Sequence, residues 1–129
     1  MARSEAYDRH PEHVLRFEDT PAAVRIRVGE HVLAETRRGL TLLEGRYPAV
    51  VYVPREDVRM ERLRRVDHST HCPFKGDATY FDFGDHAQEG PASVAQVAWS
   101  YEDPFDQMET IRGHLAFYAD RAIIETLEE

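Results

Sequence analysis

Short runs of β-branched and aromatic residues, separated by glycine and proline, recur along most of this chain. Between Ala23 and Val28, apolar residues alternate with Arg25 and Arg27, which is the period of a strand with one buried face. Similar patterns predict strands at residues 31–36, 40–44, 49–53, 78–83, 94–101 and 115–118, with a last short pair at 123–124. Helical patterns are confined to residues 55–66 and 106–111. Many short strands and little helix favour a mainly-β domain that closes or half-closes on itself.

The length of 129 residues corresponds to one domain, since single domains usually run to roughly 100–150 residues. We expect residues 1–22 to form a polar N-terminal arm and residues 23–129 to form a single compact domain. The first residues, Met1–Pro11, contain no apolar stretch of a secretory signal, and no run is long enough for a membrane helix. These features and the unpaired thiol of Cys72 predict a cytoplasmic protein.

The charge balance argues against several classes of partner. The chain has 16 basic and 24 acidic residues, a net charge of −8, which disfavours nucleic acid and anionic membrane surfaces as partners. A single cysteine, Cys72, excludes an internal disulfide and any zinc site built from several thiolates. No motif for a cofactor is found, so we expect none, and we assign no metal ligands.

The segment from His68 to Tyr80 concentrates chemically active residues. It contains two histidines, the only cysteine, the only lysine, an aspartate, a serine and two threonines, and we expect residues 67–77 to form a loop before a strand. The candidate catalytic residues are Cys72 as nucleophile and His68, His71 or Lys75 as its activating partner. Alternatively, Cys72 is a small buried residue, as free cysteines usually are.

Two other functions are compatible with this segment. His68 and His71 have the spacing of metal ligands, with Cys72 and Asp77 nearby, but Pro73 argues against the helix that would align the two histidines. An anion-binding pocket is the other, with Lys75, the hydroxyls of Ser69 and Thr70 and a histidine holding a carboxylate or phosphate. A purely structural loop that satisfies its own backbone is equally compatible.

Aromatic residues elsewhere suit the wall of a pocket. Tyr47, Tyr52, Trp99 and Tyr101 lie in or beside predicted strands, where aromatic side chains are more often core than ligand contacts. Their polar tips also suit a ligand site, so together with Lys75 they would form an apolar slot with a few polar contacts.

Four motifs in order carry a family resemblance. They are G-R-Y-P followed by Y-V-P-R-E-D-V, then H-S-T-H-C-P-F-K-G-D-A-T-Y, then A-W-S-Y-E-D-P, and finally I-R-G-H-L-A-F-Y. They resemble the bacterial and fungal domain-of-unknown-function family 427 over residues 23–122, so a bacterial source is expected. The family also has a nucleotidyltransferase-like label, but this chain lacks a Gly-Ser plus paired-Asp arrangement that would hold two metals on a nucleotide.

The resemblance implies a β-tent fold, like that of methionine sulfoxide reductase B and the ligand-binding domain of cereblon. We therefore expect two small antiparallel sheets, one or two short helices and, with Cys72 alone, no zinc site. The β-tent relatives bind small ligands between their sheets, with aromatic walls. The family's motif positions in this chain are Arg46, Tyr47, Tyr52, His68, Thr70, Cys72, Lys75, Asp77, Trp99, Tyr101 and Asp103.

These observations lead to one main hypothesis and two alternatives. The main one is a pocket for a small anionic or nucleotide- or metabolite-like ligand. Lys75 and Arg46 would supply charge, His68 and Thr70 hydrogen bonds, and Tyr52, Trp99 and Tyr101 the walls, with Tyr47, Cys72 and Asp77 completing the ligand-binding set. The alternatives are an enzyme with Cys72 as nucleophile and a homodimeric interaction module joined through an edge strand.

Overall fold

Antiparallel strands dominate the computed structural model, which describes residues 9–10, 15–45, 47–84 and 94–127. The strands within these residues are β1 (Leu15–Asp19), β2 (Ala23–Val28), β3 (His31–Thr36), β4 (Leu40–Glu44), β5 (Val50–Tyr52), β6 (Leu63–Cys72), β7 (Gly76–Phe83), β8 (Val94–Ser100), β9 (Leu115–Phe117) and β10 (Ile123–Leu127). Three short 3₁₀ helices join them, namely η1 (Arg55–Asp57), η2 (Met60–Arg62) and η3 (Asp106–Ile111). The prediction of a mainly-β domain is therefore confirmed.

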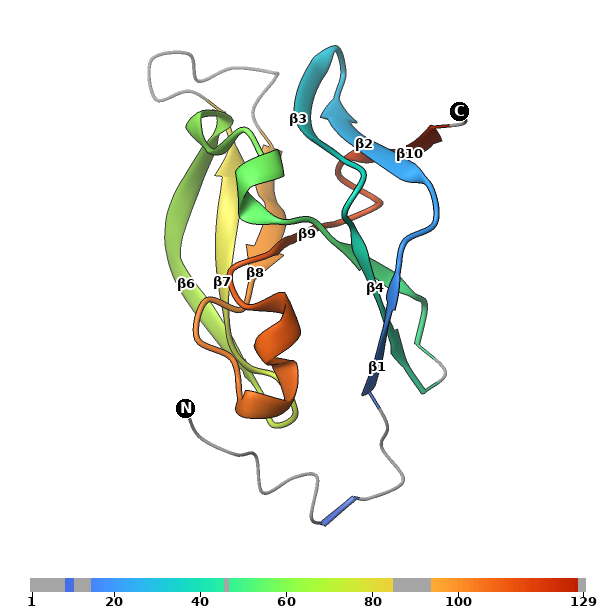
Figure 1. Cartoon of the computed structure of the whole chain (residues 1–129). Helices are drawn as coiled ribbons and strands as arrows, with labels where there is room; N and C mark the ends of the chain where they lie inside the picture. The colour runs from blue at the N-terminus through green and yellow to red at the C-terminus, as the bar shows by residue number, and fades with distance from the viewer. Residues whose placement is uncertain (1–8, 11–14, 46, 85–93, 128–129) are drawn as a thin grey trace.

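The strands form three antiparallel sheets, where the resemblance implied two. Sheet A has the order β1-β4-β5, sheet B the order β10-β2-β3, and sheet C the order β6-β7-β8-β9 (Figure 1). Sheets A and B share one long antiparallel pair, because β1 leads into β2 and β3 leads into β4. Pro21 lies between β1 and β2, where this pair is interrupted, and it lacks the backbone N–H needed to continue the ladder. The bent ribbon of β1–β2 and β3–β4 is therefore divided between sheets A and B.

Two hydrogen bonds hold that bend. The amide of Thr20 donates to the carbonyl of Gly39 at 2.9 Å, and the hydroxyls of Thr20 and Thr41 lie 2.8 Å apart. A Cβ at Gly39 would lie 3.2 Å from Oγ1 of Thr20 and from a methyl group of Val51, so glycine permits the close approach. The corner is thus specified by the sequence on both of its strands.

The segment that we predicted to be a loop is largely a hairpin. Strand β6 continues to Cys72, a tight turn follows, and β7 begins at Gly76, with Cys72 opposite Gly76 and His71 opposite Asp77. The prediction of a loop over residues 67–77 is therefore wrong. Strand β6 is an edge strand of sheet C and is largely exposed, so its polar side chains lack the hydrophobic alternation that signals a strand.

The N-terminal boundary also differs from the expected one. Leu15–Asp19 forms β1 and pairs with β4, with Phe17 opposite Leu42, so the sheet begins inside the expected arm of residues 1–22. Residues 1–8 and 11–14 of that arm lie outside the described residues. The helical patterns at residues 55–66 and 106–111 correspond to η1 and η2 and to η3, but residues 63–66 of the first pattern form the start of β6.

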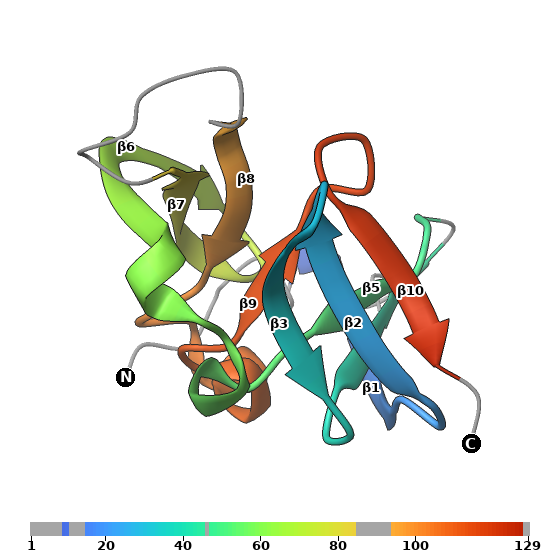
Figure 2. The ribbon, with the colours of Figure 1, turned by 90° about the horizontal axis from the view of Figure 1, so that it is seen from above.

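Sheet C packs against both other sheets through two clusters of buried residues. One cluster joins it to sheet B and includes Val24, Ile26, Leu33, Phe81, Val97 and Leu115. The other joins it to sheet A and to η3 and includes Leu42, Tyr52, Ala78, Tyr101, Met108 and Ile111. Reciprocal backbone hydrogen bonds of 2.7 and 2.9 Å between Val53 and Leu115 link the end of β5 to β9. Viewed from above, β9 lies between the two halves of the molecule (Figure 2).

No helix among the described residues is both long enough and apolar enough to span a bilayer.

Candidate functional site

A cavity of about 580 Å³ lies where sheets A and C face each other. This volume falls in the range of about 300–1,000 Å³ that small-molecule sites occupy. The described residues that line it are Leu42, Glu44, Tyr47, Pro48, Val50, Tyr52, Cys72, Phe74, Lys75, Tyr80, Trp99, Tyr101 and Tyr118. Five of the chain's six tyrosines are in this set.

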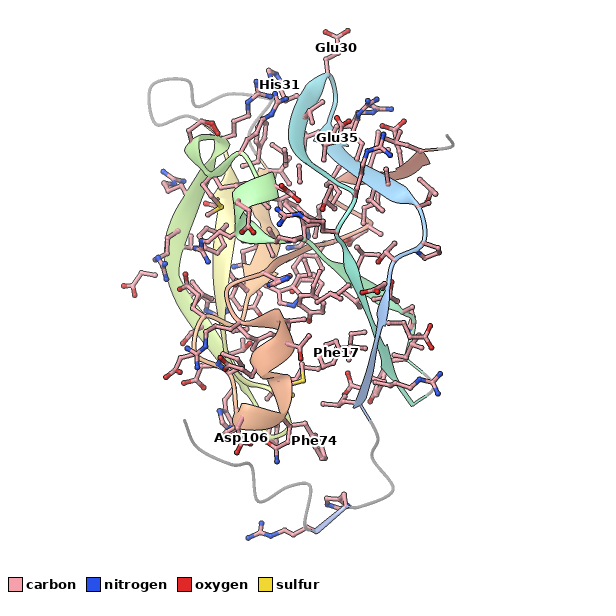
Figure 3. All side chains as sticks on the ribbon, viewed as in Figure 1. Phe17, Glu30, His31, Glu35, Phe74 and Asp106 are labelled. Atoms are coloured by element: carbon pink, nitrogen blue, oxygen red, sulfur yellow. The ribbon has the colours of Figure 1, made fainter. Side chains whose placement is uncertain are left out.

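Strand periodicity explains why these residues meet. Side chains two positions apart share one face of a strand, and this relation joins Leu42 to Glu44 on β4 and Val50 to Tyr52 on β5. In sheet C, Tyr80 of β7 lies opposite Trp99 of β8. The remaining walls come from chain just beyond the strands, at Tyr101 and Tyr118, and from the β6–β7 turn, whose Phe74 appears at the tip of the hairpin beside Asp106 (Figure 3).

Trp99 is the centre of the aromatic wall. Its ring lies 4.5 Å from that of Tyr118, measured between centroids, and meets the ring of Tyr52 edge-on at 6.3 Å. The indole Nε1–H donates a hydrogen bond of 3.3 Å to the Tyr52 hydroxyl. That hydroxyl keeps its own proton for a further hydrogen bond, so Tyr52 can donate to a ligand.

Tyr52, Tyr101 and Tyr118 are held in their neutral form. Burial raises the pKa of Tyr52 and of Tyr101 well above the ordinary value, and the Glu44 carboxylate raises both further. Burial, followed by the neighbouring Tyr80, raises the pKa of Tyr118 to about 12. These phenols therefore present O–H donors at neutral pH.

One ion pair interrupts the aromatic lining. Nζ of Lys75 lies 2.5 Å from Oε1 of Glu44, and the two side chains are only 15% and 13% exposed. The backbone of Lys75 is fixed as well, because its amide donates to Cys72 and its carbonyl accepts from Phe105. We expected Lys75 to supply charge to an anion, but in the structure Glu44 balances that charge.

The structure brings together many of the predicted site residues and separates the others. Tyr47, Tyr52, Cys72, Lys75, Trp99 and Tyr101 all line the cavity. Thr70 and His68 are not among the described lining residues but contact one of them: the Thr70 hydroxyl is 2.8 Å from that of Tyr80, and the His68 ring is 5.2 Å from the Tyr80 ring. Arg46 lies outside the described residues.

His71 and Asp77 form a separate, exposed pair. Nδ1 of His71 is 2.8 Å from Oδ1 of Asp77, with side chains 61% and 75% exposed. Adjacent residues of a strand point to opposite faces, so His71 points away from the face that carries Cys72. The structure therefore does not place Asp77 in the cavity, nor His71 next to Cys72 as its base.

The sequence reasoning missed several cavity residues. They are Leu42, Glu44, Pro48, Val50, Phe74, Tyr80 and Tyr118. Strand alternation could have identified Tyr80, which stands in the motif that we quoted. The partner of Lys75 could not have been found, since Glu44 lies on a distant strand and is one of many acidic residues.

The arrangement is suited to binding. Cys72 is half-buried on the cavity wall, and His68 and His71 are held by Tyr80 and Asp77. Within the described part of the chain, no group of three or more His, Cys, Asp or Glu side chains is placed to hold a metal ion.

A family model described as a domain of unknown function (DUF427) matches residues 16–128. No curated protein matches the chain.

Proposed function

Since this chain belongs to the DUF427 family, whose description assigns no activity, we propose its function from the cavity itself: the protein binds a small metabolite-like molecule between sheets A and C. The observation that carries this proposal is a cavity of about 580 Å³ in which aromatic walls surround the shielded Glu44–Lys75 ion pair. Apolar walls with a few fixed polar groups are typical of sites that bind small molecules.

Each part of the wall has a distinct role in this proposal. Trp99, Tyr52 and Tyr118 provide ring faces and edges against which a flat ligand packs. Tyr52 donates a hydrogen bond, because its hydroxyl oxygen already accepts one from Trp99. Lys75 and Glu44 provide a charged donor and a charged acceptor that burial makes stronger than they would be in water.

The location that we infer for this activity is the cytoplasm. Cys72 is the chain's only cysteine and lies on the cavity wall as a free thiol. A reducing compartment keeps such a thiol intact.

The test is a metabolite screen by thermal shift, with every hit repeated by NMR titration of the labelled protein. We expect the hits to shift resonances of cavity residues, and Trp99→Ala and Lys75→Ala to weaken their binding. Arg25→Ala is the control, because Arg25 lies on β2 outside the cavity and pairs with Glu35 at the surface. The proposal fails if both cavity variants bind the same hits with unchanged affinity.

The geometry favours binding over the alternative of a Cys72 nucleophile. A cysteine protease-like pair needs a base within hydrogen-bond reach of the thiol. His71 instead contacts Asp77, on the other face of β6, the contact described for His68 is with Tyr80, and the Lys75 ammonium pairs with Glu44.

A further inference from the structure

Two buried tyrosines on the cavity wall have hydroxyl protons to donate. They are Tyr52, which is 1% exposed, and Tyr101, which is 7% exposed. The indole N–H of Trp99 can only donate, so in its 3.3 Å contact with Tyr52 the phenol oxygen accepts and the phenol proton is left to bond elsewhere. Within the part of the chain that the structure describes, there is no acceptor for that proton and no partner for the Tyr101 hydroxyl.

Both hydroxyls remain donors at neutral pH. Burial raises the pKa of each tyrosine well above its ordinary value, and the neighbouring Tyr52 raises the pKa of Tyr101 further. A buried polar group without a hydrogen-bond partner costs free energy. A ligand that displaces water from these two hydroxyls must therefore bring an acceptor of its own.

A carbonyl oxygen is the acceptor that suits two donors. It has two lone pairs near the plane of its group, so it can accept from both phenols at once. The rings of Trp99 and Tyr118 lie on the same cavity and offer a surface for a flat, unsaturated body. A carbonyl group conjugated with an aromatic ring combines the two requirements.

Trp99 also influences where the Tyr52 proton points. A hydroxyl proton rotates to suit its surroundings, and the indole N–H already occupies one side of the Tyr52 oxygen. The proton is therefore directed away from Trp99. The same hydrogen bond polarises the hydroxyl and makes it a stronger donor. Trp99 thus acts through Tyr52, as a positioning residue.

We propose that the ligand is a flat aromatic carbonyl compound whose oxygen accepts hydrogen bonds from Tyr52 and Tyr101, and that Trp99 directs the Tyr52 proton toward it. This inference rests on the proposed function, since it specifies what the cavity binds. It gives the two tyrosines a role in specificity that the family match does not assign.

Two probes of nearly identical shape test for the acceptor. They are acetophenone and α-methylstyrene, in which a CH₂ group replaces the carbonyl oxygen. NMR titration of the labelled protein measures both affinities. Acetophenone labelled with ¹³C at the carbonyl reports the hydrogen bond directly, because this resonance moves downfield when the oxygen accepts. In the wild-type protein we expect the bound carbonyl to resonate downfield of its position in cyclohexane, which has no donors.

Three substitutions identify the donors. Tyr52→Phe and Tyr101→Phe should each weaken acetophenone binding roughly three- to tenfold, the effect of one hydrogen bond, and leave α-methylstyrene binding nearly unchanged. Each should also move the bound carbonyl resonance upfield. Trp99→Phe keeps an aromatic ring and removes the indole donor, so it should move that resonance upfield while Tyr52 is still present. An amide spectrum that matches the wild type establishes that each variant is folded, and the wild-type carbonyl shift needs no substitution.

The failures of the two proposals can be told apart. The carbonyl inference is wrong and the binding cavity stands if the wild-type carbonyl shift equals that in cyclohexane, or if both tyrosine variants keep the wild-type affinity and carbonyl shift. The same holds if α-methylstyrene is weakened as much as acetophenone, or if metabolite hits bind while acetophenone does not. An unchanged carbonyl shift in Trp99→Phe overturns the role of Trp99. If neither acetophenone nor any metabolite perturbs the cavity resonances, the proposed function itself is wrong.

Discussion

The indole nitrogen of Trp99 donates a hydrogen bond of 3.3 Å to the hydroxyl of Tyr52, a residue 47 positions away in the sequence. Trp99 belongs to β8 of sheet C and Tyr52 to β5 of sheet A. The bond therefore joins the two sheets that enclose the cavity. It also fixes the edge-on orientation of the two rings.

Replacing Tyr52 by phenylalanine should weaken the fold by removing the acceptor for the Trp99 indole. Tyr52 is 1% exposed and its hydroxyl is the acceptor described for the Trp99 N–H, so we expect the free energy of unfolding to fall by about 1–2 kcal/mol. Tyr47→Phe is the matched control, since Tyr47 is 70% exposed and its hydroxyl reaches water. Urea denaturation of both variants measures the difference; equal stability of the two would contradict a structural role for the bond.

Alkaline pH should reveal the burial of Tyr118, Tyr52 and Tyr101. Burial raises the pKa of Tyr118 from 10.0 to about 12, so the unfolded chain releases this proton before the folded chain does. The stabilisation is complete below about pH 10 and is lost as the pH rises through the folded value. Tyr52 and Tyr101 act in the same direction.

The measurement is the free energy of unfolding by urea at about pH 8 and about pH 11. We expect a steeper loss in the wild type than in Tyr118→Phe, because phenylalanine has no proton to release. Parallel loss in the two proteins would show that the Tyr118 phenol does not take part.

The strands could be predicted from the sequence wherever one face is buried. Val24 and Ile26 are buried while Arg25 and Arg27 are half-exposed, so the alternation on β2 is directly visible in the residue types. Strand β6 gives no such signal, because an edge strand exposed on much of its surface tolerates histidine, serine and threonine in succession. The same applies to β1, whose pairing with β4 turns an expected arm into part of sheet A.

The site could be predicted in its composition and not in its contacts. The rarity of Lys75, Cys72 and Trp99 in this chain singled them out, and the fold places all three on one cavity. The Glu44–Lys75 contact depends on how the end of β4 meets the β6–β7 turn, a long-range relation that no local pattern encodes.

Gly76 should tolerate no larger residue. It adopts φ of +112°, and a Cβ there would lie 3.2 Å from Cα of Pro104 and 3.3 Å from the backbone nitrogen of Phe105. Gly76→Ala therefore combines backbone strain with a clash against main chain, and we expect a loss of about 2–4 kcal/mol in unfolding free energy.

Gly29→Ala is the control for this position. Gly29 has φ of +57° in the β2–β3 turn, and a Cβ added there would have no atom within 4 Å. Gly29→Ala should therefore cost only the backbone strain of about 1 kcal/mol. Thermal and urea unfolding should rank Gly76→Ala clearly below Gly29→Ala in stability. Similar losses for the two would mean that Pro104 moves aside.

Cys72 should report on occupancy of the cavity without being required for it. Its half-buried thiol lies on the same wall as Lys75 and Tyr80, so an alkyl group added to the sulfur would enter the space that we assign to the ligand. We expect iodoacetamide treatment of the wild type to abolish binding of the screen's hits, and a saturating hit to slow alkylation in turn. Cys72→Ser should bind the hits with little change and should be insensitive to iodoacetamide, because serine keeps the volume and offers no nucleophilic sulfur.

Mass spectrometry follows the alkylation and NMR titration follows the binding. Unimpaired binding by the fully alkylated protein would mean that the ligand lies elsewhere, whereas loss of binding in Cys72→Ser would give the thiol the direct role that the binding proposal denies it.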